Sequence, residues 1–226
     1  MATLAPGSAA PSPQSSIAGL RATLREGRDA LRAAFLAKPD TPKLLHGHAR
    51  LVDATVRGVW RATAMPSGPA LVAVGGYGRG QLFPNSDVDV LILLPEGGGS
   101  AATAAIERFV AALWDVGLEA SHAVRTVDEC VAEMSADATI RTSLLEHRYL
   151  AGARRLHRAF ADAFAASLDP GAFYEAKALE QQQRHLRHHD AAYNLEPNVQ
   201  ESPGGLRDLQ TVVWIARAAG PGRASG

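Results

Sequence analysis

The chain has 226 residues, of which 46% are hydrophobic and 20% charged, a composition that supports a sizeable folded core. Its 23 Lys and Arg residues balance 23 Asp and Glu residues, so no overall positive charge draws it to nucleic acid. The single cysteine, Cys130, excludes an internal disulfide and a cysteine-rich zinc site, and no apolar run reaches the ~18–20 residues of a membrane span.

The N-terminal part of the chain is predicted to be helical after a short lead-in. Residues 1–16 are rich in Ala, Pro and Ser and lack the regions of a secretory signal, so we expect disorder there and a cytoplasmic protein. Apolar residues at helical spacing predict one helix over Ile17–Leu36 and a second over Thr41–Ala64.

A glycine-rich segment follows the first predicted strand, Ala70–Val74, and has the sequence GGYGRG. Glycines such as Gly75 and Gly76 let backbone N–H groups approach a phosphate chain closely, and Arg79 adds a planar, permanently charged donor. The segment is neither a Walker A loop nor a GxGxxG dinucleotide loop. Taken alone, it is also consistent with an ordinary strand-to-helix turn.

Two aspartates stand at the start of the next predicted strand, Val88–Leu94. Side chains two positions apart on a strand point to the same face, so Asp87 and Asp89 are expected to lie side by side. Two adjacent carboxylates raise each other's pKa unless a cation lies between them. Mg²⁺, bound by one or two carboxylates and by substrate phosphates, fits this pair. The alternative is a solvated strand end, with Asp87 as a turn residue.

The rest of the chain is predicted to be mainly helical. The expected elements are a helix with an apolar stripe of Ile106, Phe109, Val110, Leu113 and Trp114, a strand over Leu118–Arg125, helices from Val127 to Ala191 with a break at Asp169-Pro170-Gly171, a loop over Tyr193–Leu206, and a last helix over Arg207–Ala219.

Several polar residues in these segments have two possible roles. Glu119 on the third strand is either a third catalytic carboxylate or a solvated edge residue, and His122 is expected to be structural. His185, His188 and His189 have a helical spacing that can bind zinc, but their strongly polar surroundings favour a solvated face or a phosphate-contacting surface.

The turn and the aspartate pair together resemble the signature of the polymerase-β-like nucleotidyltransferases. Three further segments extend the resemblance to the family of bifunctional PII uridylyltransferase/uridylyl-removing enzymes, over about Leu71 to Ala216. Gln81 is a departure, since the family usually has Glu there. The supporting segments are LWDVGLEASHAVRT (Leu113–Thr126), QQRHLRHH (Gln182–His189) and YNLEPNVQESPGGLRDLQT (Tyr193–Thr211).

The resemblance implies an α/β (α+β) fold, in which a nucleotidyltransferase core with a mixed sheet is flanked by N-terminal and C-terminal helices. It implies Mg²⁺-dependent transfer of UMP from UTP to a tyrosine hydroxyl of a PII protein. Asp87 and Asp89 would hold the metal and act in catalysis with Glu119. The implied nucleotide-binding residues are Gly75, Gly76, Arg79, Ser86 and Arg207.

Against this family, the expected organisation is a lead-in (1–16), N-terminal helices (17–66), a nucleotidyltransferase core (67–135) and a truncated helical segment (136–226). Uridylyl removal and glutamine sensing are expected to lie outside the chain, and the last helix is expected to expose Val212, Val213 and Ile215. The alternatives are a non-catalytic remnant that binds nucleotide or a partner, and a transferase of the same fold with another nucleotide or acceptor.

Overall fold

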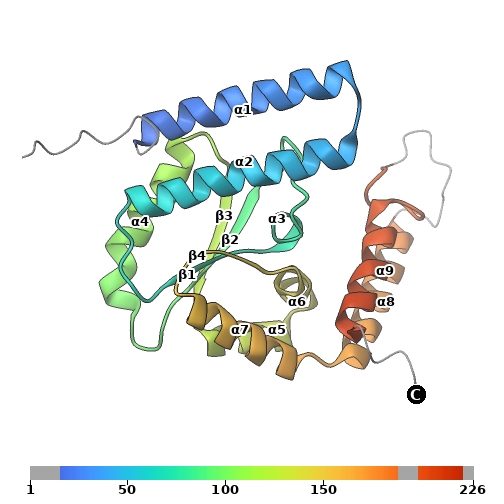
Figure 1. Ribbon diagram of the computed structural model, residues 1–226. Coiled ribbons are helices and arrows are strands. Elements are labelled where there is room, and N and C mark those ends of the chain that lie inside the picture. Colours follow the sequence, from blue (N-terminus) through green and yellow to red (C-terminus); the bar gives the residue numbers. More distant parts are fainter. Residues whose placement is uncertain (1–15, 188–197, 221–226) are drawn as a thin grey trace, which may run out of the picture. The chain divides into compact units, whose positions relative to one another are not determined.

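The computed structural model describes residues 16–187 and 198–220 (Figure 1). The lead-in expected over residues 1–16 therefore lies outside the described residues, apart from Ser16. The chain forms two compact units, which are described separately. The first contains residues 1–126 and 148–157, and the second contains residues 127–147 and 158–226.

The first unit begins with two helices that pack side by side, α1 (Ile17–Ala37) and α2 (Thr41–Ala62) (Figure 1). Each begins at a residue that satisfies a free backbone N–H group of the first turn. Ser16 Oγ accepts from the Gly19 amide at 3.0 Å, and Asp40 Oδ1 accepts from the Lys43 amide at 3.0 Å. The two predicted N-terminal helices are therefore confirmed to within two residues at their ends.

The sheet of the first unit is mixed, with the strand order β3-β2-β1-β4 in the described residues. Its strands β2 and β3 are parallel and joined by the crossover helix α4 (Gly99–Asp115), whereas β1 is antiparallel to β2 and β4. The predicted mixed α/β core is therefore confirmed. The strands are β1 (Ala70–Ala73), β2 (Val88–Leu93), β3 (Ala120–Arg125) and β4 (Arg148–Gly152).

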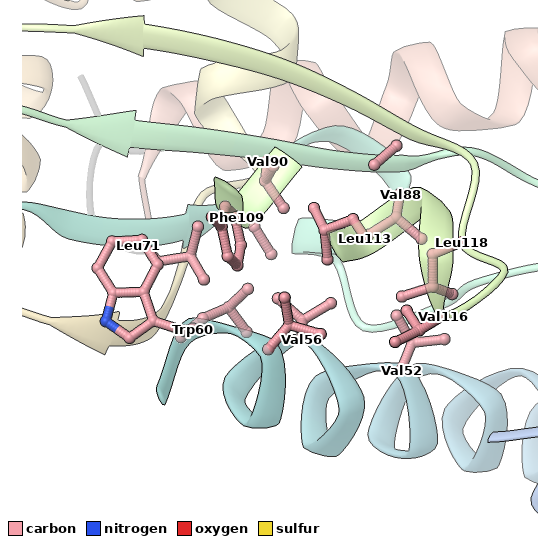
Figure 2. Close-up of a cluster of buried hydrophobic side chains, with 14 of the residues drawn as sticks. Val52, Val56, Trp60, Leu71, Val88, Val90, Phe109, Leu113, Val116 and Leu118 are labelled. Atoms are coloured by element: carbon pink, nitrogen blue, oxygen red, sulfur yellow. The ribbon is translucent and has the colours of Figure 1, made fainter. Parts of the chain in front are cut away.

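A continuous apolar core lies between this sheet and the helices α2 and α4 (Figure 2). Val52 and Val56 of α2 are fully buried, as is Phe109 of α4. The Phe109 ring meets Trp60 edge to face, with centroids 5.2 Å apart and planes at 83°. Burying a side chain of this size stabilises the fold by roughly 1.5–3 kcal/mol, so this layer fixes α2 against the sheet.

The prediction for Trp114 is wrong, because this side chain is 56% exposed rather than part of the apolar stripe of α4. Phe109 and Leu113 occupy the core side of the helix. Trp114 follows Leu113 directly, and one residue turns an α-helix by about 100°. The indole therefore points away from the core.

A strand interrupts the segment 136–226, which we expected to be helical. β4 pairs with β1, with Ala73 opposite Arg148 and Ala70 opposite Gly152. Its sequence, RYLAG, is short and has no clear alternation, so only the tertiary pairing with β1 makes it a strand. The predicted domain boundaries themselves remain a prediction.

The second unit is helical where it is described. A small apolar cluster joins its last helix to α8, with Phe173, Trp214 and Ala218 at the centre. Ile215 packs on this cluster, which corrects the expected exposure, whereas Val212 and Val213 are exposed as expected. The helices are α5 (Val127–Ala136), α6 (Ala138–Leu145), α7 (Arg154–Ser167, which begins in the first unit), α8 (Pro170–Arg187) and α9 (Leu206–Ala219).

Phe109→Ala is expected to lower the free energy of unfolding by about 3–5 kcal/mol, because it leaves a cavity beside Trp60 in the core. Urea denaturation followed by circular dichroism measures the change. Trp114→Ala, on the same helix but exposed, is the control and is expected to cost about 0.5 kcal/mol or less. Equal losses for the two variants would contradict the described core.

Candidate active site

The two aspartates lie at the start of β2, on the face of the sheet opposite the α2 core. Asp87 immediately precedes the strand and is exposed, and Asp89 is its second residue and half-buried. Val88 and Val90 alternate with them and are buried in the core. The predicted side-by-side placement of the carboxylates follows from this alternation.

Burial, and then the negative charge of Asp87, raise the pKa of Asp89 above its ordinary value. Within residues 16–187 and 198–220, neither carboxylate forms an ion pair with a basic side chain. A bound cation would relieve this repulsion, so the electrostatics of the pair suit a metal ion.

The donor set suits a hard divalent cation such as Mg²⁺. Carboxylate oxygens are the hard ligands that Mg²⁺ prefers, and this ion is commonly held by one or two carboxylates, with phosphates and water completing its shell. In the described part of the chain, no group of three or more His, Cys, Asp or Glu residues is arranged to hold a metal. Two carboxylates leave most coordination positions of such an ion to substrate phosphates and water.

Glu119 lies just before β3 rather than on it, which corrects its predicted position. The Val88 amide donates to the Glu119 carbonyl at 2.8 Å, and Val88 pairs with Ala120 in the parallel ladder. Glu119 therefore lies at the same end of the paired strands as Asp87, and its side chain is exposed. His122 pairs with Val90 and so alternates away from the carboxylate face. The catalytic role of Glu119 remains a prediction.

The glycine-rich segment is a single helical turn, α3 (Gly75–Gly78), rather than an open loop. The amides of Gly78, Arg79 and Gly80 donate to the carbonyls of Val74, Gly75 and Tyr77, so the turn itself uses these three donors. Gly75 and Gly80 have φ of +57° and +76°, which side chains disfavour. The turn is joined to the carboxylate strand because the Val74 amide donates to the Asp89 carbonyl at 3.1 Å.

Three residues that hold this turn were missed by the sequence analysis: His48, Asp53 and Arg148. His48 is buried, and its Nδ1–H donates to the Leu82 carbonyl at 3.1 Å, just beyond the turn. Arg28 Nε donates to His48 Nε2 at 3.3 Å, and burial lowers the pKa of the imidazole, so it is held neutral. In the sequence, His48 and Asp53 could have been recognised as two polar residues on the apolar, buried side of α2.

Arg207 lies in the second unit and is engaged there. Its guanidinium donates to Glu201 Oε1 at 3.2 Å and to Gln210 Oε1 at 3.2 Å, and it lies 5.5 Å from the centre of the Trp214 ring. Ser86, in the first unit, is exposed between α3 and β2, and its amide donates to the Phe83 carbonyl. Nucleotide contacts by Ser86 and Arg207 remain predictions.

The SPGGLRD segment joins α9 to α8 through Asp208. Its carboxylate accepts hydrogen bonds from Gln181, His185, Arg184 and the Gly204 amide. Partial burial opposes ionisation, but these donors hold the pKa of Asp208 well below its usual range. His185 is thus tied to a carboxylate, while His188 and His189 lie outside the described residues.

Two known families match the sequence. Residues 64–141 match the family described as nucleotidyltransferase domain, and residues 172–225 match the family described as GlnD PII-uridylyltransferase. The first match contains α3, both aspartates and Glu119, and the second contains the SPGGLRD segment. A nucleotidyltransferase domain is therefore present around the carboxylate pair.

Curated relatives carry the name bifunctional uridylyltransferase/uridylyl-removing enzyme. The protein from Aromatoleum aromaticum is 51% identical over 210 residues, which are 93% of this chain and 24% of that protein. Those from Chromobacterium violaceum and Bordetella avium are 50% and 52% identical over 89% and 88% of the chain, again 24% of each relative. The chain thus spans about a quarter of their length. None of its described helices has the length and apolar character needed to span a membrane.

Asp89→Asn is expected to raise the midpoint of thermal unfolding at pH 7 in EDTA. Because the folded-state pKa of Asp89 is raised, its ionised form is less favourable in the folded chain than in the unfolded chain, and this cost is present above the folded-state pKa. Added Mg²⁺ is expected to stabilise the wild type and not the variant. Asp115→Asn, an exposed change on α4, is the control. A lower midpoint for Asp89→Asn in EDTA would contradict the described charge repulsion.

Asp208→Asn is expected to lower the free energy of unfolding by about 3 kcal/mol at pH 7, since it removes the nearer of the two carboxylates that face the buried Arg184 and leaves only Glu201, at 3.9 Å. The lowered pKa makes this stabilisation complete above the ordinary Asp value of about 3.9 and gradually lost as the pH falls below it. Denaturation at pH 7 and pH 3 measures both effects. The exposed Asp162→Asn change serves for comparison, and a pH-independent difference would refute the assignment.

Proposed function

Because the chain belongs to the family of bifunctional uridylyltransferase/uridylyl-removing enzymes, we propose that it transfers UMP from UTP to a tyrosine hydroxyl of a PII protein. The observation that carries the proposal is the repelling pair Asp87 and Asp89, joined by a backbone hydrogen bond to a glycine-rich turn. We further propose that the chain acts in the cytoplasm.

The proposed reaction is attack by the tyrosine oxygen on the α-phosphorus of UTP. A bond forms between that oxygen and the α-phosphorus, the bond from the α-phosphorus to the bridging oxygen breaks, and pyrophosphate leaves. Mg²⁺, when bound, would neutralise charge on the phosphates. Asp87 and Asp89 would hold it. Glu119, at the same end of the strands, would accept the proton of the attacking hydroxyl.

The turn is proposed to bind the β- and γ-phosphates through Gly75, Gly76 and Arg79. An added Cβ at Gly76 would meet no atom closer than 3.7 Å, so packing within the chain does not require a glycine there. Close approach of a phosphate would require one. The nearest atom is Nη2 of Arg79, so this guanidinium lies where it would meet the same phosphate. Ser86 and Arg207 are proposed to add polar contacts to the nucleotide.

In the proposed mechanism, most of the rate comes from placement and charge rather than from covalent chemistry. β2 is a central strand, paired on both sides by β1 and β3, so the carboxylates stand on a rigid support. The phosphates would be held by the neighbouring turn. Holding the reacting groups in line and neutralising the developing charge are the two largest sources of acceleration in phosphoryl transfer.

The test is to incubate the purified chain with Mg²⁺, labelled UTP and a PII protein. Label on a PII tyrosine is expected, and Asp89→Asn is expected to reduce the transfer by about a hundredfold or more, while Asp115→Asn leaves it unchanged. Circular dichroism shows that each variant is folded. Absence of label with a folded wild-type chain would refute a self-sufficient transferase, and preferential transfer from labelled ATP would refute the assignment of UTP.

A further inference from the structure

The first unit contains an ion pair that the proposed chemistry does not use. Arg148, at the start of β4, donates from Nη1 to Asp53 Oδ2 at 2.6 Å and from Nη2 to Asp53 Oδ1 at 3.0 Å. The two residues are 95 positions apart in the sequence, and the Asp53 side chain is only 10% exposed. Such a two-pronged pair fixes the plane and direction of the guanidinium as well as its position.

Two further donors of this guanidinium are directed at the glycine-rich turn. Nε of Arg148 donates to the Gly78 carbonyl at 3.1 Å, and Nη2 donates to the Tyr77 carbonyl at 3.1 Å. These carbonyls belong to the last two residues of α3, where helical bonding is incomplete; the Tyr77 carbonyl also accepts from the Gly80 amide. Arg148 therefore closes the C-terminal end of the turn, and Asp53 holds Arg148 in place.

The ring of Tyr77 completes this arrangement from the other side. Tyr77 is fully buried, and the Arg148 guanidinium lies 5.4 Å from the centre of its ring. The turn is therefore held both by its carbonyls and by the buried side chain of Tyr77. His48, on the same helix as Asp53, holds the Leu82 carbonyl beyond Gly80, so α2 fixes the segment on both sides of Arg79.

We propose that Asp53 and Arg148 are positioning residues that hold the turn of Gly75–Gly80 in the conformation that receives the nucleotide phosphates. This inference rests on the proposed function for what the turn binds. Four of the five N–H donors of this guanidinium are already used within the chain, so we assign the pair to holding the turn and not to binding the substrate. Its effect on the reaction would pass through the shape of the turn.

Arg57 provides a matched control within the same network. Its Nη2 lies 3.4 Å from Asp53 Oδ2, and its Nε donates to the Leu150 carbonyl at 2.9 Å. It thus shares the carboxylate with Arg148, but its hydrogen bonds in the structure reach β4 and not the turn. Losing either arginine removes a partner of Asp53, but only the loss of Arg148 removes hydrogen bonds to the turn.

The first measurement is amide hydrogen exchange over residues 75–82 in the full chain, which requires no activity. Arg148→Ala is expected to speed exchange of the Gly78, Arg79 and Gly80 amides by about tenfold, since two hydrogen bonds to the turn are lost. Arg57→Ala is expected to leave these amides unchanged. Equal acceleration in both variants, or none in Arg148→Ala, would overturn the proposal.

The second measurement is the affinity for UTP with Mg²⁺ by calorimetry, and the KM and kcat where transfer is detected. Arg148→Lys keeps the charge but cannot span Asp53 and two carbonyls, so it is expected to weaken UTP binding by about fivefold or more without unfolding the chain. An unchanged affinity in this variant would overturn the proposal. A wild-type chain that binds no UTP would instead refute the proposed function, and the exchange comparison would still decide whether Arg148 holds the turn.

Discussion

The packing of α2 on the sheet is the constraint on which the candidate site depends. One side of this helix buries Val52, Val56 and Val59 completely against the strands and α4. The same burial carries His48 and Asp53 to the places where they hold the glycine-rich segment from two directions. Burial of the apolar side of α2 thus fixes the backbone conformation of the turn that is proposed to bind the phosphates.

The candidate site also shows how a fold can keep an unfavourable charge arrangement. Asp89 is half-buried beside a like charge, and no hydrogen bond shown by the structure relieves it among the described residues. In the second unit the opposite holds, since Asp208 is surrounded by donors that favour its ionised form. The first arrangement suits a carboxylate that binds something, and the second suits a carboxylate that joins two helices.

The sequence predicted best what local pattern controls. The helices α1 and α2, the strand Val88–Leu93 and the face shared by Asp87 and Asp89 all follow from periodicity and turn residues. β4 could not be found in this way, because its five residues become a strand only through pairing with β1. Arg148 was missed for the same reason, since its partners are distant in sequence. Trp114 was misplaced because hydrophobicity alone does not show where an apolar stripe ends.

The position of β4 also bears on how the first unit comes together. Its sheet is interrupted in the sequence by residues 127–147, which belong to the second unit. While the polypeptide emerges from the ribosome, β1 therefore has an open hydrogen-bonding edge until Gly152 has been made. An N-terminal fragment ending at Thr126 would keep that edge open permanently, and its Asp53 would lack the paired hydrogen bonds from Arg148. A shorter version of this chain made for crystallography or protein engineering must therefore include β4.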